Sequence, residues 1–81
     1  MKSITYSYIV IEPYEPPAVG ERQEYVVRAR RSRTVIASIA WYAAWGQYCF
    51  FPDEGTAWSA GCMADVQDFI ARLAREAKET P

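Results

Sequence analysis

The chain has 81 residues, of which 51% are hydrophobic, 23% charged and 15% aromatic, with no histidine and a formal net charge of −1. This length allows one small domain, because a second core would need roughly 50 more residues, and the composition excludes a disordered chain. The absence of histidine removes Ser-His and Cys-His nucleophile pairs and the commonest general base. We therefore expect a protein that is not an enzyme.

The first half of the chain predicts three strands. Residues 3–12 are rich in β-branched and aromatic side chains without a helical period, which is typical of a strand. A stiff, proline-rich connection follows over residues 13–21, and the next two strands are expected at residues 22–30 and 34–42. A three-residue loop, residues 31–33, places one set of side chains on a common face of the sheet: Tyr25, Val27, Ala29, Val35, Ala37, Ile39 and Trp41.

Residues 34–52 carry no charged side chain and follow several arginines, a pattern shared with membrane-spanning segments. The aromatic residues of this stretch lie at its centre rather than at its ends, and a glycine interrupts it, so we favour a hairpin. Its second strand is expected at residues 47–52, after a four-residue loop at residues 43–46. This loop pairs two sets of residues across the hairpin: Trp41 with Tyr48, and Ile39 with Phe50.

The last segment predicts an amphipathic helix over residues 60–78. Ser59 is a suitable N-cap, because its hydroxyl can accept a hydrogen bond from the first turn. Asp68 and Arg72 are four residues apart and are expected to form an ion pair on the helix surface. Apolar side chains recur at helical spacing at Cys62, Val66, Phe69, Ile70, Leu73 and Ala77.

Together these elements predict an α+β fold for a single domain of residues 1–81. The expected architecture is a four-stranded antiparallel meander (β-β-β-β-α) with the C-terminal helix packed on one face. Because only one helix is expected, the opposite face of the sheet should be uncovered. Val26, Ile36 and Ala40 are expected to point outward from that face.

The two cysteines and the N-terminal residues indicate in which cellular compartment the protein is expected. Cys49 and Cys62 are too few for a metal site without histidine, so neither a metal nor another cofactor is expected. We favour two reduced thiols, although a single bridge between them stays open as an alternative. Polar residues interrupt the apolar N-terminal stretch and no cleavage site follows it, so a cytoplasmic location is expected.

The candidate binding residues come from an uneven charge distribution and from exposed aromatic side chains. Residues 22–34 hold five basic residues against one acidic residue, a net charge of +4, whereas residues 1–21 sum to −2 and residues 53–81 to −3. A guanidinium cluster of this kind suits phosphate or an acidic protein surface. An aromatic residue at a hairpin tip suits a protein interface. The candidate residues are Arg28, Arg30, Arg31, Arg33, Tyr42 and Trp45.

Residues 39–52 carry a motif that resembles a group of small proteins of bacteria, phages and other mobile elements. The shared pattern is I-x-W-[FY]-x-x-W-x-Q-Y-x-F-x-P, followed by a helix that contains Asp68 and Phe69, and the similarity covers about residues 39–73. No activity is known for this group, so the resemblance assigns no functional residue. It implies a mobile-element context, in which small proteins such as anti-CRISPR proteins often occlude a host protein.

The leading hypothesis is therefore a non-enzymatic protein–protein binding module that uses the open sheet face and the hairpin of residues 28–33. Its partner would be a second copy, giving a homodimer, or a host protein that it inhibits. The alternative is single-stranded nucleic-acid binding by the same surface, with bases stacked on rings above a basic groove. The acidic balance of the chain, with a pI of about 5.3, disfavours that alternative.

Overall fold

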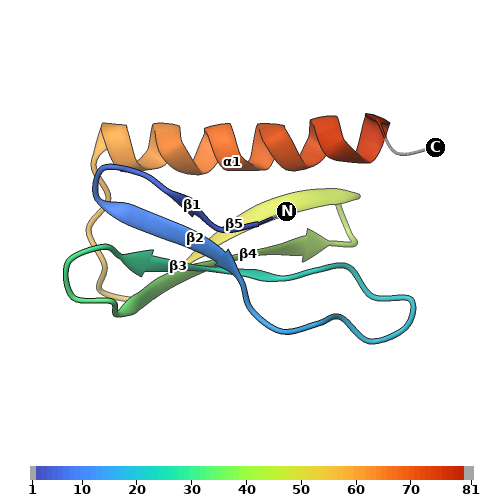
Figure 1. Cartoon of the computed structure of the whole chain (residues 1–81), viewed down its shortest axis with the longest axis horizontal. Coiled ribbons are helices and arrows are strands. Elements are labelled where there is room, and N and C mark those ends of the chain that lie inside the picture. The colour runs from blue at the N-terminus through green and yellow to red at the C-terminus, as the bar shows by residue number, and fades with distance from the viewer. Residues whose placement is uncertain (1, 80–81) are drawn as a thin grey trace.

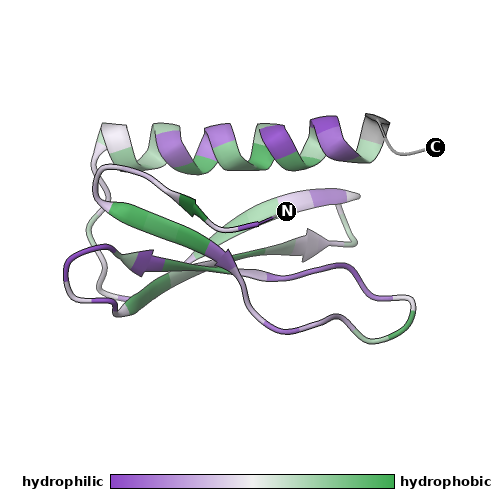
Figure 2. Cartoon of the chain, in the orientation of Figure 1, coloured by the Kyte–Doolittle hydropathy of each residue, from purple (hydrophilic) through white to green (hydrophobic). Residues whose placement is uncertain are grey.

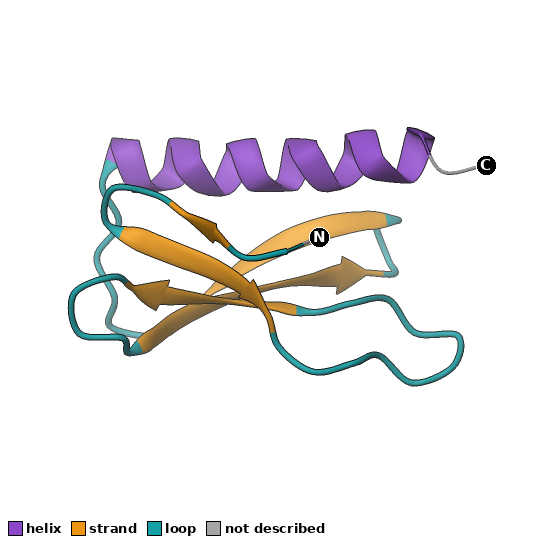
Figure 3. Ribbon diagram, in the orientation of Figure 1, coloured by secondary structure: helices purple, strands orange, loops and turns teal. Residues whose placement is uncertain are grey.

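A sheet and one helix form two layers in the computed structural model, which describes residues 2–79 (Figure 1). Five strands are hydrogen-bonded in their chain order, and every neighbouring pair is antiparallel. Helix α1 runs along one face of the sheet (Figure 3). The predicted α+β class, antiparallel meander and C-terminal helix are confirmed. The elements are β1 Ile4–Thr5, β2 Ile9–Pro13, β3 Tyr25–Ala29, β4 Val35–Tyr42, β5 Gln47–Pro52 and α1 Ala60–Glu79.

The prediction of a single strand over residues 3–12 is wrong, because this segment folds back on itself. β1 and β2 form a hairpin, and the sheet therefore has five strands rather than four. The hairpin tip, Ser7-Tyr8, contains none of the glycine, asparagine or proline residues that mark tight turns. The N–H of Tyr6 donates to the carbonyl of Ile9 at 2.8 Å across this turn, and a long-range contact supports it, since the N–H of Arg30 donates to the carbonyl of Tyr8 at 2.9 Å.

A β-bulge between β3 and β4 reverses part of the predicted alternation. Val27 opposes Ala37 as expected, but Arg28 opposes Val35, which leaves Ile36 as the extra residue of the bulge. Val35 is consequently exposed on the face opposite α1, and Ile36 packs against the core. Both side chains point to the face opposite to the one predicted. The sequence does not reveal the bulge, because apolar residues run through it without a break and no glycine marks it.

The β4–β5 hairpin has the predicted loop and register. Trp41 opposes Tyr48 and Ile39 opposes Phe50, and the rings of Trp41 and Tyr48 meet edge to face with centroids 5.6 Å apart. The uncharged stretch of residues 34–52 thus supplies two strands. In the described part of the chain, no helix has the length and apolar character needed to cross a bilayer.

Ser59 caps α1 as predicted. The N–H of Cys62 donates to Ser59 Oγ at 3.1 Å, and the N–H of Met63 donates to the Ser59 carbonyl at 3.0 Å. The cap satisfies one of the backbone donors that the first turn of a helix leaves free.

We expect Ser59→Ala to lower the free energy of unfolding by about 1 kcal/mol, because the N–H of Cys62 loses its acceptor. Urea unfolding followed by circular dichroism measures the change. Ser59→Asp keeps an acceptor and adds a negative charge at the helix N-terminus, so its stability should match or exceed that of the wild type. Equal stability of Ser59→Ala and the wild type would contradict the role of the cap.

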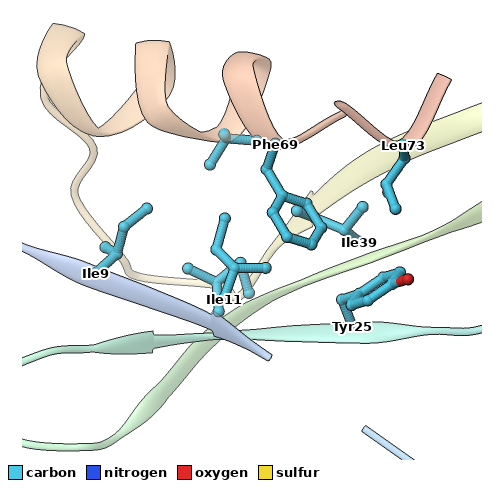
Figure 4. Packing of buried hydrophobic residues seen from close by; sticks show 9 residues of the cluster. Ile9, Ile11, Tyr25, Ile39, Phe69 and Leu73 are labelled. Carbon is cyan, nitrogen blue, oxygen red and sulfur yellow. The ribbon is translucent and has the colours of Figure 1, made fainter. Parts of the chain in front are cut away.

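The core lies between α1 and the sheet (Figure 4). α1 contributes Val66, Phe69 and Leu73 at the predicted helical spacing. Figure 2 shows hydrophobic residues along β2 and alternating hydrophilic and hydrophobic residues along α1, as expected of elements buried on one side. The strands contribute Ile9, Ile11, Tyr25, Val27, Ala37 and Ile39.

A polar contact fastens the first hairpin to α1. The Tyr6 hydroxyl donates to Asp68 Oδ2 at 2.8 Å, and Arg72 Nε donates to the same oxygen at 2.8 Å. Desolvation, together with the hydrogen bond to Asp68, raises the pKa of Tyr6 from 10.0 to about 12. Hydrogen bonds from Tyr6 and Arg72 lower the pKa of the Asp68 carboxyl. The predicted Asp68–Arg72 pair is confirmed, and Tyr6 extends it across to the sheet.

Candidate functional site

Within residues 2–79, no helix or strand packs on the sheet face opposite α1, which we call the open face (Figure 1). The strand register determines which side chains share this face, because neighbouring residues of a strand point to opposite sides. On the four longer strands it holds Val10, Glu12, Val26, Arg28, Val35, Ser38, Ala40, Tyr42, Gln47, Cys49 and Phe51.

An ion pair shields the part of the open face formed by β2 and β3. Arg28 Nε donates to Glu12 Oε1, and the two residues stand beside Val10 and Val26 in the register. The two valines are only 7% and 8% exposed. Val26 therefore does not offer the outward apolar surface that the sequence predicted. The charge of Arg28, one of the candidate anion-binding residues, is balanced within the chain.

The part of the open face formed by β4 and β5 is different, because three aromatic side chains lie there and one of them, Tyr42, contacts the other two. We call Tyr42, Trp45 and Phe51 the aromatic cluster. Tyr42 meets Trp45 edge to face at 5.0 Å and Phe51 at 6.3 Å between ring centroids. Yet 39% of Tyr42, 70% of Trp45 and 41% of Phe51 remain exposed. Side chains of this size are normally buried against other groups, so the cluster is an unusual feature of a small domain.

The β4–β5 turn fixes the position of the aromatic cluster. The carbonyl of Tyr42 accepts hydrogen bonds from the N–H groups of Trp45 at 3.1 Å and Gly46 at 2.9 Å. Gly46 has φ 62°, a left-handed conformation that glycine adopts at low cost. The sequence identified Tyr42 and Trp45 but missed Phe51, although its alternation with Phe50 already places it on the open face.

The remaining candidate arginines lie in the β3–β4 connection, residues 30–34, which we call the arginine loop. Arg33 closes the loop with φ 66°, at the position where glycine is usual, and its N–H donates to the carbonyl of Ala29 at 2.8 Å. Arg30 Nη1 donates to the carbonyl of Tyr6 at 3.3 Å, so part of this guanidinium supports the first hairpin. In the described chain Arg30, Arg31 and Arg33 form no ion pair.

A hollow of about 460 Å³ separates the arginine loop from the tip of the first hairpin. It is lined by Ser7, Tyr8, Arg30 and Arg31, all of which carry hydrogen-bond donors. The surroundings therefore suit an acidic group of a partner.

The structure brings the candidate residues together in two separate groups. Arg30, Arg31 and Arg33 lie at one end of the sheet, and Tyr42 and Trp45 lie at the other, because the two loops follow opposite ends of β4 (Figure 1). An eight-residue strand such as β4 is about 23 Å long. A single ligand group cannot contact both groups, whereas a broad protein surface can.

A second aromatic feature lies on the covered side of the sheet and was not found from the sequence. The guanidinium of Arg22 stacks over the Trp41 ring at 3.8 Å from its centroid, which is a cation–π contact. Beside it, a hollow of about 300 Å³ is bounded by Tyr48 and by Leu73 of α1. The Tyr48 hydroxyl donates to a backbone carbonyl at 2.9 Å, and desolvation raises its pKa. This contact anchors the proline-rich connection to the sheet.

The thiols are unpaired and lie on different sides of the sheet. Cys49 opposes Ala40 on the open face, and Cys62 of α1 packs against the core. A bridge between them is therefore excluded. Among the described residues, no three cysteine, aspartate or glutamate side chains gather closely enough to hold a metal ion.

Comparisons with known proteins do not assign the chain to a family. No protein-family model matches it, and neither a curated protein nor a solved structure is similar to it. The function must accordingly be inferred from the geometry described above.

Proposed function

We propose that this chain is a non-enzymatic protein-binding module and that the open face is its binding surface. The observation that carries the proposal is the aromatic cluster, whose three rings support one another while 39–70% of each remains exposed. Exposed tryptophan and tyrosine side chains are typical of interface hot spots, because they offer much apolar area at little entropic cost.

The extended form of the open face also supports a protein partner. Tyr42 and Phe51 project from adjacent strands, and Val35 extends the apolar surface towards the other end of β4. This stripe of apolar side chains runs along a sheet rather than around a cavity. Protein interfaces have this extended form, whereas small ligands are usually enclosed in deep pockets.

The geometry gives less support to single-stranded nucleic-acid binding. That function needs rings next to the cations that follow the phosphate backbone. Here the aromatic cluster and the arginine loop lie at opposite ends of β4. The rings of the cluster also pack edge to face with one another, at 90° and 71°, rather than standing apart to receive bases.

We expect Trp45→Ala to weaken the capture of the partner from a lysate of the source cells at least tenfold, because the most exposed ring of the cluster is lost. The measurement compares the proteins retained by immobilised wild type and variant. Trp45 lies in a turn with 70% of its surface exposed, so the variant should keep its fold and unfolding midpoint.

Met63→Ala is the matched control, since Met63 is an exposed apolar residue of α1, on the other side of the sheet from the aromatic cluster. This variant should retain the same proteins as the wild type. If Trp45→Ala and Met63→Ala both capture them at wild-type levels, the open face is not the binding surface.

A further inference from the structure

We propose that the partner of the open face is a second copy of this chain, stacked face to face with its strands running in the opposite direction. The inference rests on the proposed function and names the occupant of the same surface. It follows from the arrangement of charge at the two ends of the sheet, which is complementary to itself under one particular two-fold rotation.

One end of the sheet is basic near its middle strands. Arg31 and Arg33 project there from the arginine loop between β3 and β4, and neither has a carboxylate partner within the described chain. Arg28 lies beside them but is balanced by Glu12.

The opposite end of these middle strands is acidic. The β2–β3 connection leaves the sheet there and carries Glu15, Glu21 and Glu24, which gather with Arg22 around one hollow. A second hollow places Glu21 and Glu24 next to Ala40 on β4. Arg22, whose guanidinium stacks over the Trp41 ring, supplies one positive charge against the three carboxylates. Two negative charges are therefore in excess at this end.

The two-fold axis that stacks two copies of the open face has two limiting orientations, parallel to the strands and across them, and only the second satisfies these charges. A two-fold axis parallel to the strands would set each arginine loop over the other arginine loop. A two-fold axis across the strands reverses their direction, so each arginine loop meets the Glu21 and Glu24 segment of the other copy. Like charges repel and opposite charges attract across an interface, so the second arrangement is favoured.

This arrangement also matches the outermost strand. Asp53 and Glu54 follow β5 at the same end of the sheet as the arginine loop, but one strand further out. The axis across the strands places them over the β4–β5 turn of the second copy, residues 43–46, which carries no charge. Trp45 of that turn then faces this acidic segment, whereas Tyr42 of each copy lies over the other end of the apolar stripe, near Val35, so these two exposed side chains cover one another.

Charge reversal at the two ends tests the inference. One variant carries Arg31→Glu and Arg33→Glu, the other carries Glu21→Arg and Glu24→Arg, and analytical ultracentrifugation measures the self-association of each. The wild type should form a dimer, and each variant alone should associate roughly tenfold or more weakly because like charges then face each other. An equimolar mixture should restore wild-type affinity, since both ends of the mixed dimer again bring opposite charges together.

Arg75→Glu provides the control, because Arg75 is exposed on α1, on the other side of the sheet. It should dimerise like the wild type, and circular dichroism should confirm that all variants are folded. A wild type that is strictly monomeric at millimolar concentration, or a mixture that stays as weak as its components, would overturn the second copy as occupant. Capture that still depends on Trp45 in that case would leave the proposed protein-binding function standing, with a different protein as partner.

Discussion

Replacing Phe69 by alanine is expected to lower the free energy of unfolding by about 3–5 kcal/mol. Phe69 is fully buried at the centre of α1, and its ring meets the Tyr25 ring edge to face at 5.0 Å. Truncation would leave a cavity where the helix and three strands converge. A domain of this size has a total stability of only about 4–12 kcal/mol. The variant should therefore lose a large fraction of the stability of the domain.

Urea unfolding followed by circular dichroism, at equal protein concentrations, checks this expectation. Met63→Ala is the matched control, because Met63 is an exposed residue of the same helix and its loss should change stability by less than about 0.5 kcal/mol. A Phe69→Ala variant within 1 kcal/mol of Met63→Ala, on the scale of ordinary surface substitutions, would contradict the packing of α1 against the sheet.

The free energy of unfolding is expected to fall steeply as the pH rises from about 10 to about 12. Desolvation is the main cause that raises the pKa of both Tyr6 and Tyr25 from 10.0 to about 12. The unfolded chain releases these protons near pH 10, whereas the folded chain keeps them until about pH 12. The stabilisation is thus complete below pH 10 and is lost as the pH passes through the folded-state value, by about 1.4 kcal/mol per pH unit for each tyrosine.

Urea unfolding at a series of pH values measures this slope. Tyr6→Phe removes one of the two hydroxyls, so its slope between pH 10 and 12 should be shallower than that of the wild type by about 1.4 kcal/mol per pH unit. The variant also loses the hydrogen bond to Asp68, which lowers its stability at neutral pH by about 1 kcal/mol. A slope unchanged by the substitution would show that the Tyr6 hydroxyl ionises equally in both states.

The elements that could be predicted from the sequence are those whose signal is local. The register of β4 and β5 followed from parity, because Trp41 and Ile39 had to share a face with Tyr48 and Phe50 and only an even loop allows this. The start of α1 followed from the capping chemistry of Ser59. In both cases the deciding interaction joins residues that are near one another in the chain.

The features that escaped prediction depend on distant contacts. The turn that separates β1 from β2 has no turn-forming residue and is held by Arg30, more than twenty positions further along the chain. The bulge at Ile36 joins the core-facing part of β4 to the arginine loop, in which Arg33 has a left-handed conformation. Contacts with distant residues determine the conformation at this turn and this bulge, and the local sequence is compatible with that conformation.

The candidate site was predictable in its parts but not in its layout. Trp45 and the arginines were recognisable by residue type and position, yet the distance between them could not be predicted from residue order alone. The structure separates them by the length of β4 and neutralises Arg28 through Glu12. That separation turns one expected patch into two ends of a surface, and it is the basis for the inferred pairing of two copies.

The order of elements along the chain also has a consequence for biosynthesis. Every strand pairs with its neighbour in sequence, so the sheet can form through short-range contacts, which favours rapid folding. α1, which covers the apolar side of the sheet, leaves the ribosome after all five strands. At roughly 5–20 residues per second, its 20 residues take about one to four seconds to appear. During that interval both sides of the nascent sheet are exposed to solvent. A chaperone or a neighbouring nascent chain can then bind the apolar side of the sheet, which α1 covers in the folded protein.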